Sequence, residues 1–163
     1  MRVEYLIEKL QEEFGDGIQL AEGNYSPAAI QIPAEELPAV CQFLHESENT
    51  YFDQLSCITG LDDGPEAQTM NVVYSLYSIP YNQHLSLLVK LDRHEPQVPT
   101  VSHIWRAADW HEREAFDLLG IQFIHHPDLR RILLPTDWKG YPLRKDYQDM
   151  EAYHGVPMKR EEE

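Results

Sequence analysis

Residues 71–92, NVVYSLYSIPYNQHLSLLVKLD, decide the fold class of this chain. Two runs inside this stretch, 71–79 and 84–92, alternate apolar side chains with polar or mixed ones, which is the pattern of half-buried β-strands. The Pro-Tyr-Asn-Gln sequence between the runs is short enough for a hairpin turn. A third run rich in β-forming residues, 51–59, precedes them, and residues 61–68, with their Asp-Asp-Gly-Pro sequence, predict a loop. The sequence therefore predicts a three-stranded meander.

Two helices are expected on the N-terminal side of the meander. Residues 3–14 place their apolar side chains on one helical stripe, and Gly15-Asp16-Gly17 ends that helix. A short strand over 18–21 and an extended stretch as far as Ile32 should follow. A second helix opens at Pro33, with Pro38 tolerated in its first turn because the N–H that proline lacks has no partner there. Its apolar stripe consists of Leu37, Val40, Cys41 and Leu44.

The C-terminal third begins with a proline-stiffened connector, 95–100, and a third helix over 104–119 with Gly120 as its C-terminal cap. This helix should turn inward an apolar face made of Ile104, Ala108, Ala115 and Leu119. From residue 121 onward prolines permit short extended pieces at most, and irregular segments longer than roughly 15 residues are uncommon in a compact domain unless they have a function. Residues 151–163 resemble a frayed acidic tail. The expected fold class is α+β: a two-layer, mainly antiparallel or mixed sheet packed on helices, with an irregular extended C-terminal segment.

The charge of the chain is strongly negative and unevenly distributed. Thirteen Lys and Arg against 28 Asp and Glu give a net charge of −15, which disfavours nucleic acid and anionic lipid as partners. Residues 1–99 contain four basic and 16 acidic side chains, whereas residues 100–147 contain seven of each, and the remaining tail carries a net −3. Dense mixing of both signs in 100–147 indicates paired charges or an interface.

Several classes of protein are not expected. No apolar run approaches the roughly 18 residues of a membrane span, and the glutamate-rich start matches neither a signal peptide nor a transit peptide. We therefore expect a cytosolic chain, or one on the cytosolic face of a membrane. Cys41 and Cys57 stand outside any CxxC motif, so no iron–sulfur cluster or structural zinc is expected, and each should be a small buried hydrophobe.

Eight histidines prompt the question of a metal site. His103 and His111 are eight residues apart, which is neither the i,i+3 nor the i,i+4 spacing of ligands on one helix face. His125 and His126 are adjacent and would point to opposite sides of an extended segment. Structural or interface hydrogen bonding therefore explains these histidines better than metal binding.

The third predicted helix carries a Glu-Arg-Glu-x-x-Asp run, Glu112 to Asp117. Paired carboxylates can catalyse proton transfer when they are buried together, but such a run is more often a solvated face or an ion-pair network. If Arg113 belongs to a buried network, its replacement by alanine should cost about 3–5 kcal/mol, and on an exposed face about 0.5 kcal/mol or less. No nucleophile motif and no phosphate-binding glycine loop accompanies the run. A small enzyme that uses Glu112, Glu114 and His126 stays an alternative, as does a free protein-binding adaptor.

Residues 110–147, WHEREAFDLLGIQFIHHPDLRRILLPTDWKGYPLRKDY, combine aromatic residues, arginines and prolines with balanced charge. Arginine and tryptophan are enriched at protein–protein hot spots, and a proline-stiffened backbone loses little entropy when it docks. This composition indicates a protein interface. The same stretch, with its ERE-x-FDLLGI, HPDLRRIL and DW-x-GYPLRKDY segments in order, resembles the signature of the 30 kDa subunit family of respiratory complex I, the proton-pumping NADH:quinone oxidoreductase.

The resemblance implies a non-catalytic subunit of the peripheral arm that packs against the large quinone-site subunit and neighbouring cluster-bearing subunits. It implies no cofactor in this chain, with FMN and Fe–S clusters in partner subunits that pass electrons from NADH to quinone, and a peripheral location on the cytoplasmic side of the inner (plasma) membrane. The resembling domain is 1–147, divided into a helix and meander part (1–94) and a signature helix and docking segment (100–147), with an acidic tail over 148–163. The interface or structural signature residues implied are Glu112, Arg113, Glu114, Asp117, His126, Pro127, Asp128, Arg130, Arg131, Trp138, Tyr141, Pro142, Arg144, Lys145 and Asp146.

Overall fold

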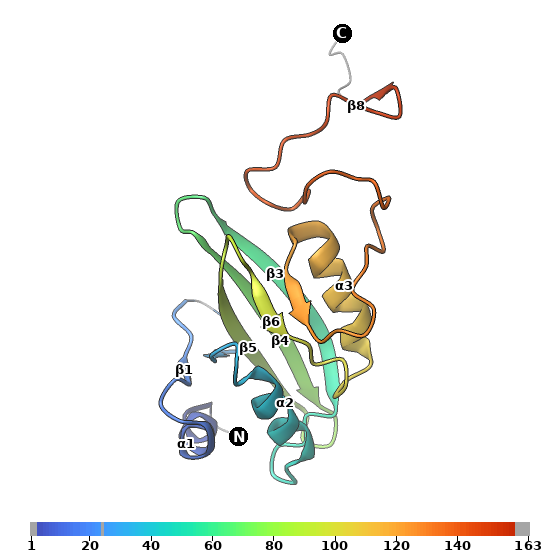
Figure 1. Ribbon diagram of the computed structural model, residues 1–163. Helices are drawn as coiled ribbons and strands as arrows, with labels where there is room; N and C mark the ends of the chain where they lie inside the picture. Colours follow the sequence, from blue (N-terminus) through green and yellow to red (C-terminus); the bar gives the residue numbers. More distant parts are fainter. Residues whose placement is uncertain (1–2, 24, 159–163) are drawn as a thin grey trace.

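The computed structural model describes residues 3–23 and 25–158 of the 163-residue chain. In chain order its elements are α1 (Val3–Phe14), β1 (Gln19–Leu20), β2 (Ala29–Gln31), α2 (Leu37–Glu46), β3 (Gln54–Gly64), β4 (Thr69–Ser78), β5 (Gln83–Asp92), β6 (Gln97–Pro99), α3 (Ala107–Leu119), β7 (Gln122–Ile124), β8 (Ala152–Tyr153) and β9 (Val156–Pro157) (Figure 1). The predicted α+β class is confirmed: a mixed sheet is packed on helices.

The predicted meander forms the centre of the sheet. β3, β4 and β5 pair antiparallel in sequence order, and every second side chain of β4 from Met70 to Ser78 is buried. The β4–β5 register places Tyr74 opposite Leu87 and Leu76 opposite Leu85, so the apolar sets of the two strands share one face. Alternation in the sequence thus predicted both the strands and the face that they bury.

The predicted loop over 61–68 is wrong for its first half. β3 continues through Asp62 to Gly64, with irregular register near Leu55 and again near Asp62, and the turn is confined to residues 65–68. An acidic residue inside a strand is tolerated here because the Asp62 carboxylate lies against Arg93, which neutralises its charge.

The N-terminal extended stretch adds an edge to the sheet. β2 pairs parallel with β5, and β1 pairs antiparallel with β2, so the strand order is β1-β2-β5-β4-β3. The parallel pair makes the sheet mixed. Ile30 lies opposite Leu87 and both are fully buried, which couples this edge to the core.

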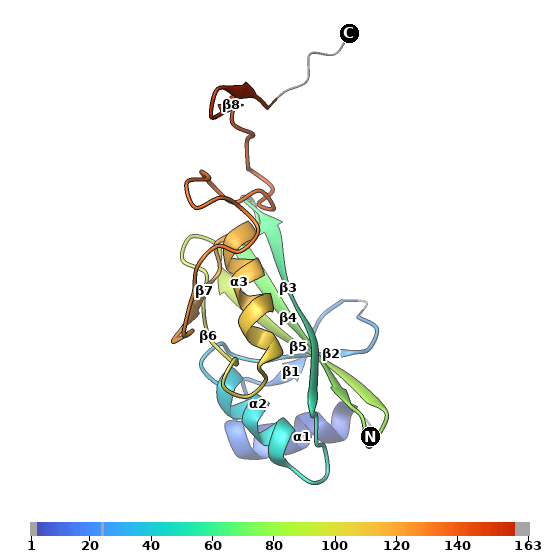
Figure 2. The same cartoon turned by 90° about the vertical axis from the view of Figure 1, so that its right-hand side faces the viewer.

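Helices α2 and α3 lie over one face of the sheet, and α1 packs beside α2 (Figures 1 and 2). The Phe14 ring of α1 meets the Phe43 ring of α2 edge-on, with centroids 5.8 Å apart. Pro38 stands in the first turn of α2, as predicted, and the α2 stripe is buried as expected. Cys41 is fully buried, whereas Cys57 is only half-buried, which corrects the expectation for that residue.

Helix α3 begins at Ala107, three residues later than predicted, because the preceding residues form a turn whose N–H groups bond to the carbonyl of Val101. Gly120 ends it with a φ of 77°, the left-handed conformation expected of a glycine C-cap. The helix lies close to β3 because Gly60 has no side chain, and a Cβ there would collide with the Leu119 side chain. Ala108, Ala115 and Leu119 are buried as predicted.

The C-terminal segment runs along α3 and then leaves the body of the molecule (Figures 1 and 2). β7 pairs parallel with β6, so the proline-stiffened connector supplies a strand that was not predicted. Within the described part of the segment, residues 125–151 contain no helix or strand, as the sequence indicated. Residues 152–157 form the β8–β9 hairpin instead of a frayed tail, and the rest of that tail, 159–163, lies outside the described residues.

Candidate functional site

Asp117 on α3 holds the start of the irregular segment against the helix. Its side chain is fully buried, and its Oδ1 accepts a 2.8 Å hydrogen bond from Nη1 of Arg131. Burial alone would raise the pKa of Asp117, but backbone donors and the Arg131 guanidinium outweigh it and lower the pKa below its usual range. The donors to Oδ2 are the backbone N–H groups of Leu134, Leu133 and Ile132, at 2.9, 2.8 and 3.0 Å. Asp117 therefore acts as a structural anchor for this turn.

The carbonyl end of α3 is satisfied by the same segment. Arginine side chains and a backbone N–H reach the carbonyls that a helix leaves unpaired in its last turn, and the cations also complement the helix dipole. The contacts are Arg131 Nη1 to the Asp117 carbonyl at 3.1 Å, the Leu143 N–H to the Leu118 carbonyl at 3.0 Å and Arg144 Nε to the Leu119 carbonyl at 2.7 Å. Two arginines of the predicted docking segment are thus used inside the chain.

Tyr141 packs between these arginines. The guanidinium carbons of Arg131 and Arg144 lie 5.3 and 4.9 Å from the centre of its ring, within range of cation–π attraction. The ring also covers Gly120, where an added Cβ would come within 2.6 Å of it. Gly120 is therefore required both for its positive φ and for this close approach.

A second anchor joins the segment to the end of the sheet. Asp62 of β3 and Arg93 form a bidentate ion pair with N···O distances of 2.7 and 3.0 Å, and Arg93 also lies 2.5 Å from Asp146. The Lys145 N–H donates to Oδ2 of Asp62 at 2.8 Å. Hydrogen bonds from Arg93 lower the pKa of Asp62 to about 2, against the effect of burial and with help from the N–H groups of Lys145 and Gly64. The carbonyl of Asp63 receives the ammonium of Lys145.

Sequence reasoning included Asp146 and Lys145 among the signature residues but missed Asp62 and Arg93. Asp62 was assigned to a loop, where an aspartate needs no partner. Arg93 is one of only four basic residues among residues 1–99, and it directly follows the long apolar run of β5. That isolated position at a strand end was the one available signal.

Glu112 is buried in the first half of α3. Its Oε1 accepts a 2.8 Å hydrogen bond from the Val101 N–H, and its Oε2 accepts one from the Thr100 hydroxyl. Burial raises its pKa to about 7, although both hydrogen bonds oppose that rise, and the neighbouring Asp109 carboxylate adds to it. Glu112 lies on the same helical stripe as Ala108 and Ala115, and that spacing was a signal in the sequence that it faces the core.

His126 lies beside Glu112 with a fully buried side chain. Its Nε2 is 3.7 Å from Oε2 of Glu112 and 3.2 Å from the carbonyl oxygen of Asp109. Its Nδ1 lies 3.0 Å from the Asp128 N–H, which can only donate, so Nδ1 is the acceptor and Nε2 carries the proton toward the Asp109 carbonyl. This arrangement fixes the ring and joins the segment after β7 to α3.

The constellation of Glu112, Glu114 and His126 is not assembled. Glu112 and His126 meet, but Glu114 points to solvent on another face of α3. The side chains of Glu112 and His126 have no exposed surface, so a substrate has no access to them. The geometry therefore does not favour the small-enzyme alternative.

Arg113 is buried but loosely paired. Its guanidinium carbon lies 5.1 Å from the centre of the Trp110 ring, its Nε donates to the Arg130 carbonyl at 3.3 Å, and its Nη1 is 4.0 Å from the Asp128 carboxylate. The partners Arg130 and Asp128 form a mutual ion pair at 3.0 Å on the exposed surface. The tight buried ion pairs that the sequence suggested for Arg113 are made instead by Asp117 and Asp62.

The far part of the segment forms its own small cluster. The Trp138 and Tyr153 rings lie 5.3 Å apart, and Asp137 accepts hydrogen bonds of 2.8 Å from the Tyr153 hydroxyl and from His154 Nε2. This contact holds the β8–β9 hairpin against the segment. Of the signature prolines, Pro127 is exposed and Pro142 is half-buried.

Among residues 3–23 and 25–158 no group of three or more His, Cys, Asp or Glu side chains is arranged to hold a metal ion. His103 and His125 are exposed and His111 is half-buried. In the same described ranges no helix is both long enough and apolar enough to cross a membrane.

The sequence profile of the family described as "Respiratory-chain NADH dehydrogenase, 30 Kd subunit" matches residues 30–153. The chain belongs to this family. Similar proteins, each named as the C subunit of NADH-quinone oxidoreductase, occur in Chloroherpeton thalassium (41% identical over 91% of this chain) and Moorella thermoacetica (42% over 87%). This chain spans 62% of the Chloroherpeton protein and 93% of the Moorella protein, so the relatives differ in length.

Two solved structures extend the comparison. A trypsin-resistant fragment of Nqo5 is 29% identical, with a TM-score of 0.63 over 79% of this chain and the whole of that fragment. A chain of an archaeal membrane-bound sulfane sulfur reductase has a TM-score of 0.72 over 91% of this chain and 86% of that chain, and at 21% identity it shows likeness of fold alone. The family match contains both anchors on α3, Glu112 and Asp117, and the whole segment that they fix.

Proposed function

We propose that this chain is a non-catalytic subunit of the peripheral arm of a proton-pumping NADH:quinone oxidoreductase, docked against the quinone-site subunit. In that role it supports electron transfer from NADH through FMN and Fe–S clusters, held by partner subunits, to quinone. The complex would place it on the cytoplasmic side of the membrane, with residues 1–147 as the docking domain and 148–163 as an acidic tail.

The observation that carries this proposal is the state of the segment that follows β7. Its polar groups are bound to α3 and to the end of β3, so its path is determined within the chain. Its large apolar side chains point outward nevertheless: Leu133 is 60% exposed and Leu143 is 59% exposed. A rigid segment that presents apolar side chains between charged ones has the anatomy of a protein interface.

The test is affinity purification of the tagged chain from a mild-detergent extract, with iron and quinone reductase activity measured in the eluate. The wild-type chain should recover both, because iron must come from partner subunits. The double variant Leu133→Asp/Leu143→Asp should lose both, since buried carboxylates in an interface cost more than the contact contributes. Ile79→Asp, at an equally exposed residue in the turn at the other end of the sheet, is the matched control and should behave as wild type. An iron-free wild-type eluate would contradict the proposal.

A further inference from the structure

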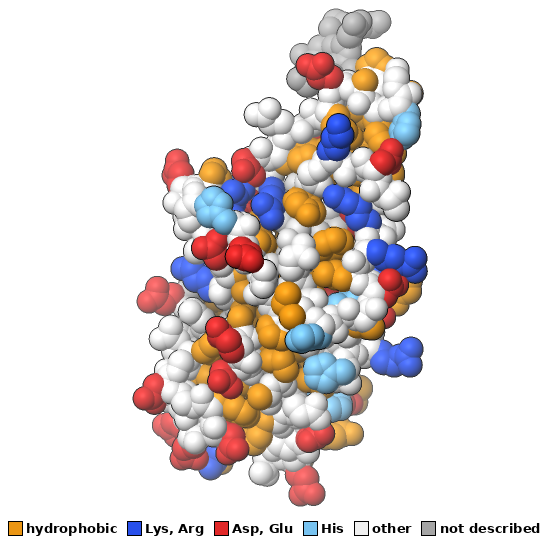
Figure 3. Space-filling model, viewed as in Figure 1, with side chains coloured by type: hydrophobic (Ala, Val, Ile, Leu, Met, Phe, Trp, Pro, Cys, Tyr) orange, Lys and Arg blue, Asp and Glu red, His pale blue; other side chains and the backbone are white. Residues whose placement is uncertain are grey.

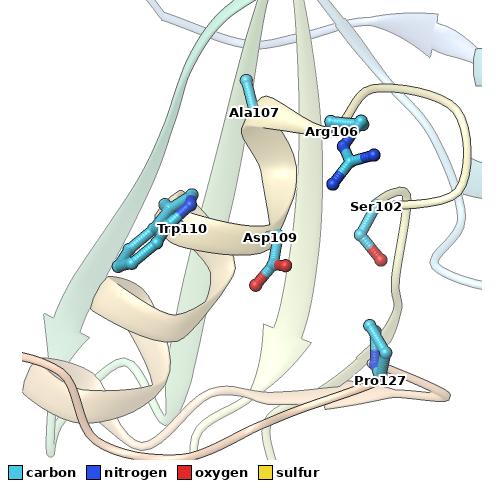
Figure 4. Close-up of a pocket in the computed structure, with 6 residues that line it drawn as sticks. All are labelled: Ser102, Arg106, Ala107, Asp109, Trp110 and Pro127. Atoms are coloured by element: carbon cyan, nitrogen blue, oxygen red, sulfur yellow. The ribbon is translucent and has the colours of Figure 1, made fainter.

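A pocket opens beside the first turn of α3, at a distance along the chain from Leu133 and Leu143. Its volume is about 490 Å³, and it is lined by Ser102, Arg106, Ala107, Asp109, Trp110 and Pro127. Figure 4 shows the side chains of Arg106, Ser102 and Asp109 around one open space, with Pro127 on the facing segment and Trp110 on the next turn of the helix. Three elements that are distant in sequence therefore contribute to one hollow.

The polar groups of the pocket are not all satisfied by the chain itself. Arg106 and Asp109 are i,i+3 neighbours, yet they form no ion pair, and Arg106 makes no hydrogen bond with any described side chain or carbonyl. Oδ1 of Asp109 has no hydrogen-bond partner in the described chain and lies 3.5 Å from Nε2 of His126 at the floor of the pocket. The Ser102 hydroxyl is in contact with the Thr100 hydroxyl at 2.9 Å.

The apolar wall of the pocket is exposed and held in place. Trp110 is 64% exposed, the largest exposed fraction of any Phe, Tyr or Trp side chain in the described residues. The Arg113 guanidinium stacks on it at 5.1 Å and limits the freedom of the ring. A rigid, exposed tryptophan beside an unpaired arginine is the residue combination found at interface hot spots.

The hollow continues past Ser102 and Pro127 into a second one of about 470 Å³, also bordered by Pro38, Pro99 and Ile124. The surface around the pair of hollows carries Arg106, His103 and His125 and belongs to the one part of the chain that is not net acidic. In Figure 3 most of the Lys and Arg visible lie near α3 and the C-terminal segment, while acidic side chains cover the end formed by α1 and α2.

We infer that this pocket docks a loop of a partner subunit that presents a carboxylate to Arg106 and an apolar side chain to Trp110 and Pro127. The inference rests on the proposed function, because the partner is taken to be a subunit of the same complex. Charge complementarity selects an acidic loop: the Arg106 guanidinium has five N–H donors in a fixed fork that matches a carboxylate, and no acceptor within the described ranges pairs with it. The remaining length of the second hollow receives the apolar residues that follow.

The test compares variants in the same affinity purification. Arg106→Glu and Trp110→Ala should each lower the iron recovered per tagged chain by about tenfold or more, as expected for a hot-spot charge reversal or truncation. Lys90→Glu is the matched control: Lys90 is exposed on β5, the change in net charge is the same, and recovery should equal that of wild type. Far-UV circular dichroism and urea unfolding verify that each variant folds, which the exposure of both side chains favours.

A photo-crosslinking amino acid, benzoylphenylalanine, in place of Trp110 then identifies the loop in the intact complex. The expected product is a peptide of a partner subunit with Asp or Glu beside the crosslinked residue. Wild-type recovery by Arg106→Glu and Trp110→Ala, or a crosslinked peptide with no acidic residue, overturns the docking site and leaves the proposed function standing. Failure of the wild-type chain to recover iron overturns the proposed function, and the docking site with it.

Discussion

Glu112→Gln should make this protein more stable at alkaline pH relative to the wild type. Burial raises the pKa of Glu112 to about 7 in the folded chain, against an ordinary value of 4.5 that we take for the unfolded chain. Between these values the unfolded state has released the proton and the folded state keeps it, so stability falls as pH rises. Glutamine cannot ionise, and its amide can still accept the hydrogen bond of the Val101 N–H.

The size of the effect follows from the two pKa values. At about 1.4 kcal/mol per pKa unit, linkage gives a wild-type loss of about 2.5 kcal/mol between pH 5 and pH 8 that the variant lacks. The free energy of unfolding of Glu112→Gln minus that of wild type should therefore rise by this amount over the interval. Taking the difference cancels the titration of the eight histidines, which both chains share.

Urea unfolding of both chains at pH 5, 6, 7 and 8 measures this difference directly. Glu114→Gln is the matched control, since Glu114 is exposed on the same helix, and its difference from wild type should stay flat. A flat difference for Glu112→Gln as well would refute the reasoning, because it would mean that Glu112 is ionised at pH 5 in the folded protein. The same pair of variants separates a structural role from catalysis, since neither should change a turnover of the isolated chain.

Other changes test the two anchors. Arg93→Met leaves the buried carboxylate of Asp62 without its partner and should destabilise the chain by about 3–5 kcal/mol in urea unfolding, while an effect below about 1 kcal/mol would place the pair in solvent. Asp117→Ala removes the acceptor of three backbone N–H groups, so trypsin should cleave the segment after β7 at least as fast as an unstructured peptide, and unchanged resistance would show that other contacts suffice. Gly120→Ala should cost about 1–3 kcal/mol because of its positive φ and the approach of Tyr141, as measured by the shift of the thermal midpoint, and a neutral result would mean that the ring moves aside freely.

The strands and helices were largely predictable because their signals are local. Period-two alternation identified β4 and β5, and the apolar stripe and capping glycine identified α3. The prediction failed where a residue's local preference was overruled by a distant partner. Asp62 has the local preference of a loop residue, and β3 passes through it only because Arg93, 31 residues away, pairs with it. β6 likewise forms because β7 lies beside it, and nothing within the connector indicates that neighbour.

The candidate site divides in the same way. The composition of residues 110–147 correctly indicated a segment rich in ion pairs, and the helical spacing of Glu112 with Ala108 and Ala115 was consistent with its burial. The spacing could not show that Arg131 and Arg144 turn inward to α3 while Leu133 and Leu143 remain exposed. Direction in an irregular segment has no period, so sequence position does not determine which side chains face out.

By itself the sequence determined the family, the fold class, the central meander and the helix that carries the signature, because periodicity and capping act over a few residues and the motif is long. Only the tertiary structure decided which charges are buried together, which glutamate of the Glu-Arg-Glu run faces the core, and that Arg106 and Trp110 meet Pro127 around one pocket. These pairings join residues separated by 17 to 83 positions. They depend on how the sheet, the helix and the returning segment pack in space, and no local pattern encodes that packing.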